Sequence, residues 1–405
     1  MHRGRGAMQL TKLDFHPLSF VPEGADVLVG RADTESYALL PADGAALLEK
    51  LADGMPPESA AGWYAQTYGE GLDLAEFVAD LDELGFLRHG EPATVTPGPV
   101  RLRWLGRLLF SPAAFCCYAV VIGWAGVLMA WHPQLRPQAG QVFFTRSLLL
   151  VQILVLFGQV PWMLLHESFH VLAGRRLGLG STLGIGTRLH VFVVVETRMN
   201  GLLGVPRAKR YLPYLAGMVV DLVAVGGLEI LAYVSRDGAG GMSLTGRVAQ
   251  AMAFPILVRF AYQFQLFLQT DVYFVVATAL GCHDLHAATR AVVLNWLHRL
   301  TGRRSRLVDL GQWSDRDRRV ARWYAPFFAA GVAVLLGMWL LALLPVLVGV
   351  VRLAVRGLDM PVRAPLFWDT ALFLAINVAQ FGFYFYLTGR NYVRHRRTRT
   401  RRQQV

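Results

Sequence analysis

The sequence predicts a mainly α-helical, polytopic membrane protein with about six transmembrane helices, preceded by a small N-terminal α+β domain that is winged-helix-like. The chain of 405 residues is 54% hydrophobic and only 17% charged, which is low for a soluble protein of this size. Apolar segments near or above the roughly 20 residues that cross a bilayer follow a mixed N-terminal region. They are approximately residues 108–131, 147–174, 212–234, 248–281, 324–351 and 366–387. We expect the long fourth segment to be broken or tilted near Pro255.

The region before the first apolar segment has the pattern of a small soluble domain. Short strands alternate with polar turns, and amphipathic helices follow. The strands are expected at residues 26–29, 35–40 and 85–87, and the helices at 42–51, 57–68 and 72–84. Leu47, Leu48 and Leu51 lie on one face of the first helix, which predicts that this face is buried.

Composition changes mark the boundaries between the parts of the chain. Residues 91–99 are rich in proline, with a glycine, as in a linker. The proposed parts are an N-terminal domain at 1–92, a linker at 93–104, a six-span membrane domain at 105–390 and a basic cytosolic tail at 391–405.

The formal charge of +12 comes almost entirely from arginine, and its distribution predicts an orientation. Arginines concentrate in loops 175–211 and 282–323 and in the tail, whereas the opposite loops carry fewer. Because basic loops face the cytoplasm, we expect both termini there. The N-terminal region also lacks the apolar core of a signal peptide. Arginine in place of lysine suits a GC-rich bacterial genome, so we expect a bacterial inner membrane protein. The basic tail is interpreted as a lipid and topology anchor, with no nucleic-acid partner.

The second apolar segment contains the sequence His166-Glu167-Ser168-Phe169-His170. On a helix, two histidines four residues apart lie on one face and can share a tetrahedral zinc ion, with the glutamate as general base. Ionisable side chains are costly within a membrane and are usually functional there. The motif therefore predicts a zinc hydrolase that acts within the membrane. The alternative is that these residues form a polar helix end at the membrane surface.

A catalytic zinc site needs a third protein ligand and an open position for water. The fourth apolar segment runs in the same direction as the second and contains one acid, Asp271. Counted along each helix, Asp271 lies at a depth similar to that of His166 and His170. Asp221, in the third segment, is expected to reach the same layer. Both aspartates are therefore candidates on depth alone.

This pattern resembles the site-2 protease family of intramembrane zinc metalloproteases. Members have His-Glu-x-x-His in one span and an Asp-Gly motif in a later one, whose aspartate completes the zinc site. The resemblance implies that His166 and His170 are ligands, that Glu167 is the base and that Asp271 is the third ligand. It covers roughly residues 147–278. The sequence around Asp271 is similar to that of a branch identified as peptide zinc metalloproteases, which is found with genes for ribosomally made, modified peptides.

The sequence departs from the family pattern at several positions. The family segment Ala-Gly-Pro-x-x-Asn resembles residues 216–221, where Met218 replaces the proline and Asp221 replaces the asparagine. Val272 stands where the family has the glycine after the zinc aspartate. The resemblance implies that Gly217 and Asp221 contact substrate or support the ligands.

The N-terminal domain resembles PqqD-like peptide-recognition domains. The resemblance rests on a strand, then Ser-Tyr-Ala-Leu-Leu at 36–40, a helix, Leu-Asp-Leu at 72–74 and a closing Leu-Gly-Phe-Leu at 84–87. In that family a leader peptide adds as a β-strand to the edge of the sheet. The alternative is a generic winged helix that serves as a cytosolic scaffold or binds DNA.

Together these patterns predict a zinc endopeptidase that cleaves a ribosomally made precursor peptide, with the leader held by the N-terminal domain. In the expected mechanism, zinc activates a water molecule, and Glu167 passes its proton to the leaving amine. One alternative is regulated proteolysis of a membrane-anchored signalling protein. Another is a non-catalytic membrane chaperone or export partner for a modified peptide.

Two further groups of polar residues receive structural interpretations. Cys282, His283 and nearby polar residues follow the fourth segment, and without further ligands at zinc-finger spacing they are interpreted as ordinary surface residues. Arg259 and Glu229 lie deep in the fourth and third segments. If those helices are neighbours, the two side chains are expected to pair.

Overall fold

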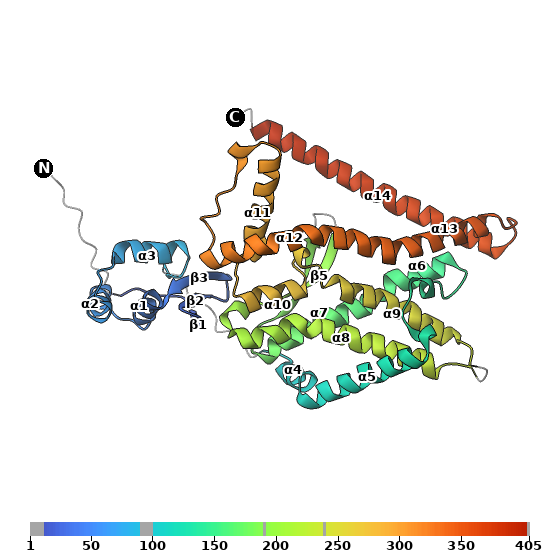
Figure 1. Ribbon diagram of the computed structural model, residues 1–405, viewed down its shortest axis with the longest axis horizontal. Helices are drawn as coiled ribbons and strands as arrows, with labels where there is room; N and C mark the ends of the chain where they lie inside the picture. The colour runs from blue at the N-terminus through green and yellow to red at the C-terminus, as the bar shows by residue number, and fades with distance from the viewer. Residues whose placement is uncertain (1–11, 90–99, 189–191, 238–239, 403–405) are drawn as a thin grey trace.

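The computed structural model describes residues 12–89, 100–188, 192–237 and 240–402 and is mainly helical (Figure 1). A three-stranded sheet lies near the N-terminus and a two-stranded sheet near the middle of the chain. The predicted fold class is thus confirmed in its coarse form. The predicted linker falls largely on residues 90–99, which lie outside the described residues, and its last positions already belong to α4 (Arg103–Leu109).

The N-terminal unit is an antiparallel sheet of order β1-β2-β3 followed by three helices. Its elements are β1 (Ser19–Glu23), β2 (Asp26–Arg31), β3 (Ser36–Pro41), α1 (Ala42–Ala52), α2 (Pro57–Tyr68) and α3 (Leu74–Glu83). The last two strands and all three helices were predicted. The first strand was not, because its sequence Ser-Phe-Val-Pro-Glu contains a proline, which is uncommon inside strands. The predicted closing strand is a single bridge between Phe15 and Leu87.

The two faces of this sheet are buried against different partners. Leu47, Leu48 and Leu51 of α1 are fully buried in the core beneath one face, as predicted. On the other face, Val21 and Leu28 are opposite one another in the register and are also buried. This second face packs on η3 (Leu202–Gly204), a turn of the membrane part of the chain. The N-terminal unit therefore sits with its sheet toward the apolar helices, as Figure 1 shows.

Most of the rest of the chain forms helices. They are α5 (Pro112–Trp131), α6 (Leu148–Phe157), α7 (Gln159–Arg176), α8 (Arg207–Val234), α9 (Leu244–Tyr262), α10 (Asp271–Leu280), α11 (Leu285–Leu300), α12 (Asp315–Met338), α13 (Leu344–Leu358) and α14 (Pro365–Arg402). A π-helical turn, η6 (Trp339–Leu343), joins α12 to α13. Within the described residues, four helical stretches are long and apolar enough to cross a membrane: Pro112–Trp131, Leu148–Arg176, Arg207–Val234 and Asp315–Leu358. They correspond to the first, second, third and fifth predicted segments, and the count of six stays a prediction.

The predicted fourth span is not one continuous helix. Helix α9 runs through Pro255 and ends at Tyr262, so the expected break near that proline is wrong. The chain then passes through a short turn, η4 (Leu266–Leu268), before α10 begins at Asp271. Gln269 has the left-handed backbone conformation, φ 54°, which an α-helix does not accept. The hydroxyl of Thr270 donates to the carbonyl of Gln263 at 2.6 Å and closes this turn.

A β-hairpin follows the helix that carries the histidine motif. Strands β4 (Thr182–Arg188) and β5 (Phe192–Arg198) pair antiparallel. The apolar sequence at residues 190–197 predicts a strand, which is confirmed from Phe192 onward, and His190 lies outside the described residues. Strand β5 packs on α7, which brings the end of the hairpin beside the histidine motif.

The buried face of α1 gives a prediction about stability. Leu48→Ala is expected to destabilise the N-terminal unit by about 2–5 kcal/mol, because it leaves a cavity in a fully buried core. Hydrogen exchange of α1 and α2 amides in the whole protein should then become faster. Leu72→Ala, at a position 39% exposed, is the matched control and should leave exchange unchanged. Equal exchange rates in the two variants would contradict this description of the core.

Candidate metal centre

Two histidines lie on one buried face of α7. His166 and His170 are 3% and 4% exposed, and their Nε2 atoms are 3.1 Å apart. Their spacing of one helical turn places both imidazoles on the same side, as the motif predicts. The following helix α8 covers this side of α7. The two rings are therefore held together in the interior and not at a polar helix end.

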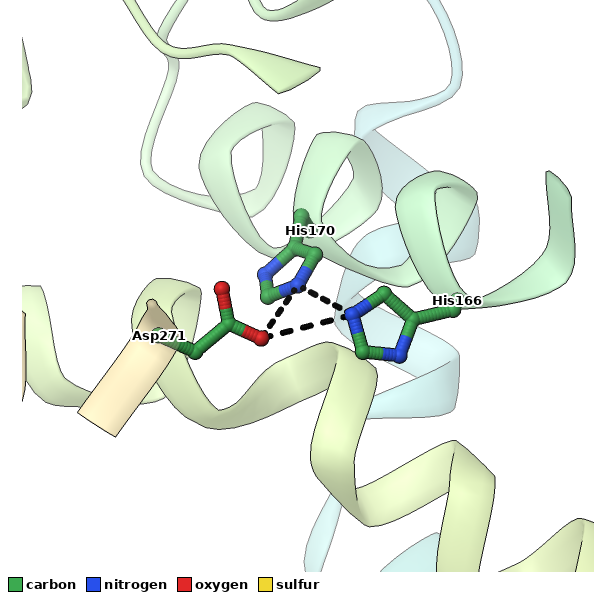
Figure 2. Close-up of side chains that lie close together, drawn as sticks. All are labelled: His166, His170 and Asp271. Carbon is green, nitrogen blue, oxygen red and sulfur yellow. Dashed lines mark hydrogen bonds and ion pairs between the residues drawn. The ribbon is translucent and has the colours of Figure 1, made fainter. Parts of the chain in front are cut away.

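Asp271 joins the two histidines from the first turn of α10. Its Oδ2 lies 3.3 Å from Nε2 of His166 and 3.2 Å from Nε2 of His170, as Figure 2 shows. Within the described residues these three side chains form a possible metal-binding triad. The structure therefore brings together the three residues that the sequence predicted as ligands.

The hydrogen bonds behind the triad fix which ring nitrogens face its centre. Nδ1 of His170 donates to the carbonyl of Pro213 at 2.7 Å, since a carbonyl can only accept. Nδ1 of His166 donates to Oδ2 of Asp221 at 2.9 Å. With both rings neutral, which is the form that binds a metal, each Nε2 presents a lone pair toward Asp271. Oδ2 of Asp271 is buried and has no hydrogen-bond partner. Three electron-pair donors thus meet with no donor group between them, an arrangement that suits a cation.

Asp221 supports the triad from behind. Besides accepting from His166, its carboxylate pairs with the guanidinium of Arg259 through Oδ1, and Arg259 Nε donates to its Oδ2 at 3.2 Å. Asp221 therefore links α7, α8 and α9. It faces the far side of His166 and is not part of the triad, which settles the choice between the two aspartates that depth alone left open. Such partners orient a ligand and raise its basicity.

The expected pairing of Arg259 with Glu229 is wrong. Helices α8 and α9 are consecutive, packed neighbours, so residues at similar distances from the segment that connects them lie opposite one another. This register places Arg259 beside Asp221, whereas the buried carboxyl of Glu229 faces Gln250. The same register can be counted from the sequence once the two helices are known to form a hairpin.

Gly217 allows α8 to approach the histidines closely. A Cβ at this position would overlap Nε2 of His170 and lie 2.5 Å from Nε2 of His166. No side chain fits there while the imidazoles keep their places. The role implied for Gly217 is thus a steric one, and it lies directly against the triad.

The interrupted helix presents the third ligand. The side-chain oxygen of Gln263 accepts from the backbone N–H of Asp271 at 3.2 Å, which ties the start of α10 to the end of α9. Asp271 was expected inside the span, with any break near Pro255, and not at the start of a separate helix. Three glutamines, which are unusual within an apolar segment, are the sequence feature that indicates this interruption of the helix: Gln263, Gln265 and Gln269.

Glu167 lies beside the triad and is held by the hairpin. Oγ1 of Thr197, near the end of β5, lies 2.7 Å from Oε2 of Glu167 and 2.9 Å from the carbonyl of the same residue. Glu167 is half-buried. A carboxylate fixed in this way next to a metal-binding triad can accept a proton from a bound molecule. Thr197 was not predicted, although it ends an apolar strand with a hydroxyl.

Cys282, which follows α10, lies in the interior of the protein. Cys282 was interpreted as a surface residue, but it is buried in the core between α10, α11 and α12. Burial raises the pKa of its thiol to about 12, so it stays protonated at neutral pH. The interpretation of Cys282 as a surface residue is therefore wrong.

Comparison with protein-family models, with curated proteins and with solved structures finds no match to this chain. The case for function therefore rests on the residues and their geometry.

The steric role of Gly217 can be tested inside one helix. Gly217→Ala is expected to lower metal affinity at least about tenfold, because its methyl group displaces the imidazoles. Gly227→Ala, on the same helix with open space around its Cβ, should bind metal like the wild type. Metal titration of both purified variants measures the difference. Alanine favours helix formation over glycine, so a loss confined to position 217 cannot come from helix propensity.

Proposed function

We propose that this protein is a zinc-dependent endopeptidase whose active site lies among its apolar helices. The observation that carries the proposal is the meeting of His166, His170 and Asp271. Glu167 directly follows His166 on α7, and Thr197 holds its carboxylate. A polar cluster of this kind is costly among apolar helices and is expected to serve chemistry.

The donor set and its spacing favour zinc. Calcium and magnesium prefer oxygen ligands, whereas two imidazoles and one carboxylate suit zinc. Ligand atoms about 2.0–2.1 Å from a tetrahedral ion lie about 3.3–3.4 Å from one another. The three distances here are 3.1, 3.2 and 3.3 Å. Hydrogen bonds from both Nδ1 atoms to a carboxylate and a carbonyl complete the usual surroundings of zinc-bound histidines.

Each residue of the site has a separate role in peptide hydrolysis. When bound, zinc lowers the pKa of a coordinated water and polarises a carbonyl oxygen. Glu167 takes the proton from the attacking water and passes it to the leaving amine. Thr197 holds the Glu167 carboxylate in place for this transfer. Asp221 and Pro213 keep the Nε2 atoms of the two histidines directed at the centre.

The membrane setting extends the same proposal. The four apolar stretches support membrane association. We place all six predicted segments across a bacterial inner membrane with both termini in the cytoplasm, as the arginine distribution indicates. The resemblance to site-2 proteases, and to their peptide zinc metalloprotease branch, agrees with this arrangement.

The proposed substrate is a ribosomally made precursor peptide. In the described sheet β3 has a pairing partner on one side only, so its other edge is open to strand addition. The PqqD-like resemblance of this unit suggests that it captures a leader peptide there. The sheet packs on η3, just before α8, which carries Gly217 and Asp221. A captured peptide would thus be held near the helix that supports the metal centre.

Replacing the base while keeping the ligands tests the proposal. Glu167→Gln is expected to retain bound zinc and to slow hydrolysis of a fluorescence-quenched peptide library by at least about 100-fold, because the proton acceptor is lost. Glu58→Gln, on the exposed surface of α2, is the matched control and should keep full activity.

Cleavage by Glu167→Gln at the wild-type rate would contradict the assignment. Normal maturation of the peptide in cells carrying only Glu167→Gln would favour a non-catalytic chaperone. Efficient cleavage of a single-span membrane protein without any contribution from residues 1–92 would favour regulated proteolysis of a signalling protein.

A further inference from the structure

A cavity of about 770 Å³ lies between the N-terminal unit and the helices that follow it. Its lining includes Glu23 and Leu39 of the sheet, Gly281 at the end of α10, and Arg316, Arg319 and Trp323 of α12. The volume is typical of ligand sites and far exceeds what a single inorganic anion needs. The cavity is separate from the metal centre, and the proposed chemistry does not use it.

Most carboxylates around this cavity already have partners. Glu23 is almost completely buried and forms ion pairs with Arg207 and with Arg210, the latter at 3.0 Å. Asp315 pairs with Arg318, one turn along α12. Asp26, on the side of the sheet, is the remaining carboxylate in the lining.

Two guanidinium groups on the α12 side have no carboxylate partner among the described residues. The Nε of Arg316 donates a hydrogen bond to the carbonyl of Leu280 at 2.7 Å, and its terminal N–H groups have no partner among the described residues. Arg319 is exposed and makes no ion pair in the described part of the chain. Arg207 also lies close, because a Cβ on Gly281 would be 2.7 Å from Arg207 and 2.8 Å from Arg316. Positive charge therefore gathers on one wall of the cavity.

The remaining surfaces suit a peptide. Trp323 and Leu39 are 49% and 37% exposed and offer apolar contacts on opposite sides. Burial lowers the pKa of His283, so this ring stays neutral at pH 7 and adds no charge. Asp26 repels carboxylates from the side of the sheet, which directs them toward α12. Arginine pairs carboxylates through two parallel hydrogen bonds, which gives both strength and orientation.

We propose that this cavity binds an acidic segment of the peptide substrate, whose carboxylates pair with Arg316 and Arg319. The inference rests on the proposed function in one respect, namely that the substrate is a peptide. It adds the chemical class of the recognised segment and a place for it between the sheet and the membrane helices.

The position of the cavity also sets a minimum distance to the cleaved bond. Helix α10 begins at Asp271 in the metal centre and ends at Leu280 beside the cavity. Its 10 residues span about 15 Å. An extended peptide advances about 3.3 Å per residue, so at least about five residues must separate the acidic segment from the cleaved bond.

Binding is best measured in a full-length Glu167→Gln background, where cleavage does not interfere. The probes are two fluorescent peptides that differ only in a run of six glutamates or six glutamines. We expect the glutamate peptide to bind more tightly in neutral detergent. Arg316→Gln combined with Arg319→Gln should weaken its binding at least about tenfold, roughly the effect of losing one charge-assisted hydrogen bond.

A matched double variant controls for net charge. Arg299→Gln combined with Arg322→Gln removes two exposed arginines that do not line the cavity and should change binding less than about twofold. Arg319→Gln alone makes the test robust to misfolding, because this side chain makes no hydrogen bond or ion pair within the described part of the chain.

An equal loss in both double variants, or no preference for glutamate, would overturn the proposal. So would a loss of binding to phosphatidylglycerol vesicles with unchanged peptide binding, because the arginines would then serve the lipid surface. The readout is binding and not hydrolysis. If the binding test fails, the zinc endopeptidase proposal therefore stands. If Glu167→Gln keeps its hydrolytic activity, the proposal that the cavity binds an acidic segment stands.

Discussion

The structure depends on one constraint, that three electron-pair donors are brought within 3.3 Å of one another in the interior of the molecule. Two imidazole lone pairs and a carboxylate are stable together in such a place only when a cation, either a proton or a metal ion, lies between them. Both outer ring nitrogens are already engaged, and Oδ2 of Asp271 has no hydrogen bond. The three side chains therefore form a possible metal-binding triad.

The neighbouring helices can be understood from that constraint. Helix α8 has a glycine at position 217 because the imidazoles occupy the space of a side chain. The chain between α9 and α10 leaves the helical path so that Asp271 reaches the histidines from a helix start. Arg259 and Asp221 form the ion pair that links α9 to α8 and, through His166, to α7. Contacts from three helices thus stabilise a charged cluster among apolar residues.

The triad could be predicted from the sequence because its chemistry has a fixed spacing. Two histidines one turn apart can be read from the sequence, and depth counting brought Asp271 to their level. The partners missed were those set by tertiary structure. Thr197 reaches Glu167 only because the hairpin folds back on α7, and Arg259 meets Asp221 only through the register of two packed helices. Tertiary pairing also explains why β1 was not predicted. Its proline is untypical of a strand, yet β1 pairs along its whole length with β2. Local pattern predicts elements and ligand spacing, whereas packing decides which polar groups meet.

The central claim is that His166, His170 and Asp271 hold one zinc ion, and the most direct test is elemental analysis of the purified full-length protein. About one zinc per chain is expected in the wild type, with a large loss in Asp271→Ala. A correctly folded wild type that binds no zinc when it is supplied would contradict the claim. An Asp271→Ala variant with undiminished zinc would do so as well, because the third ligand would then lie elsewhere.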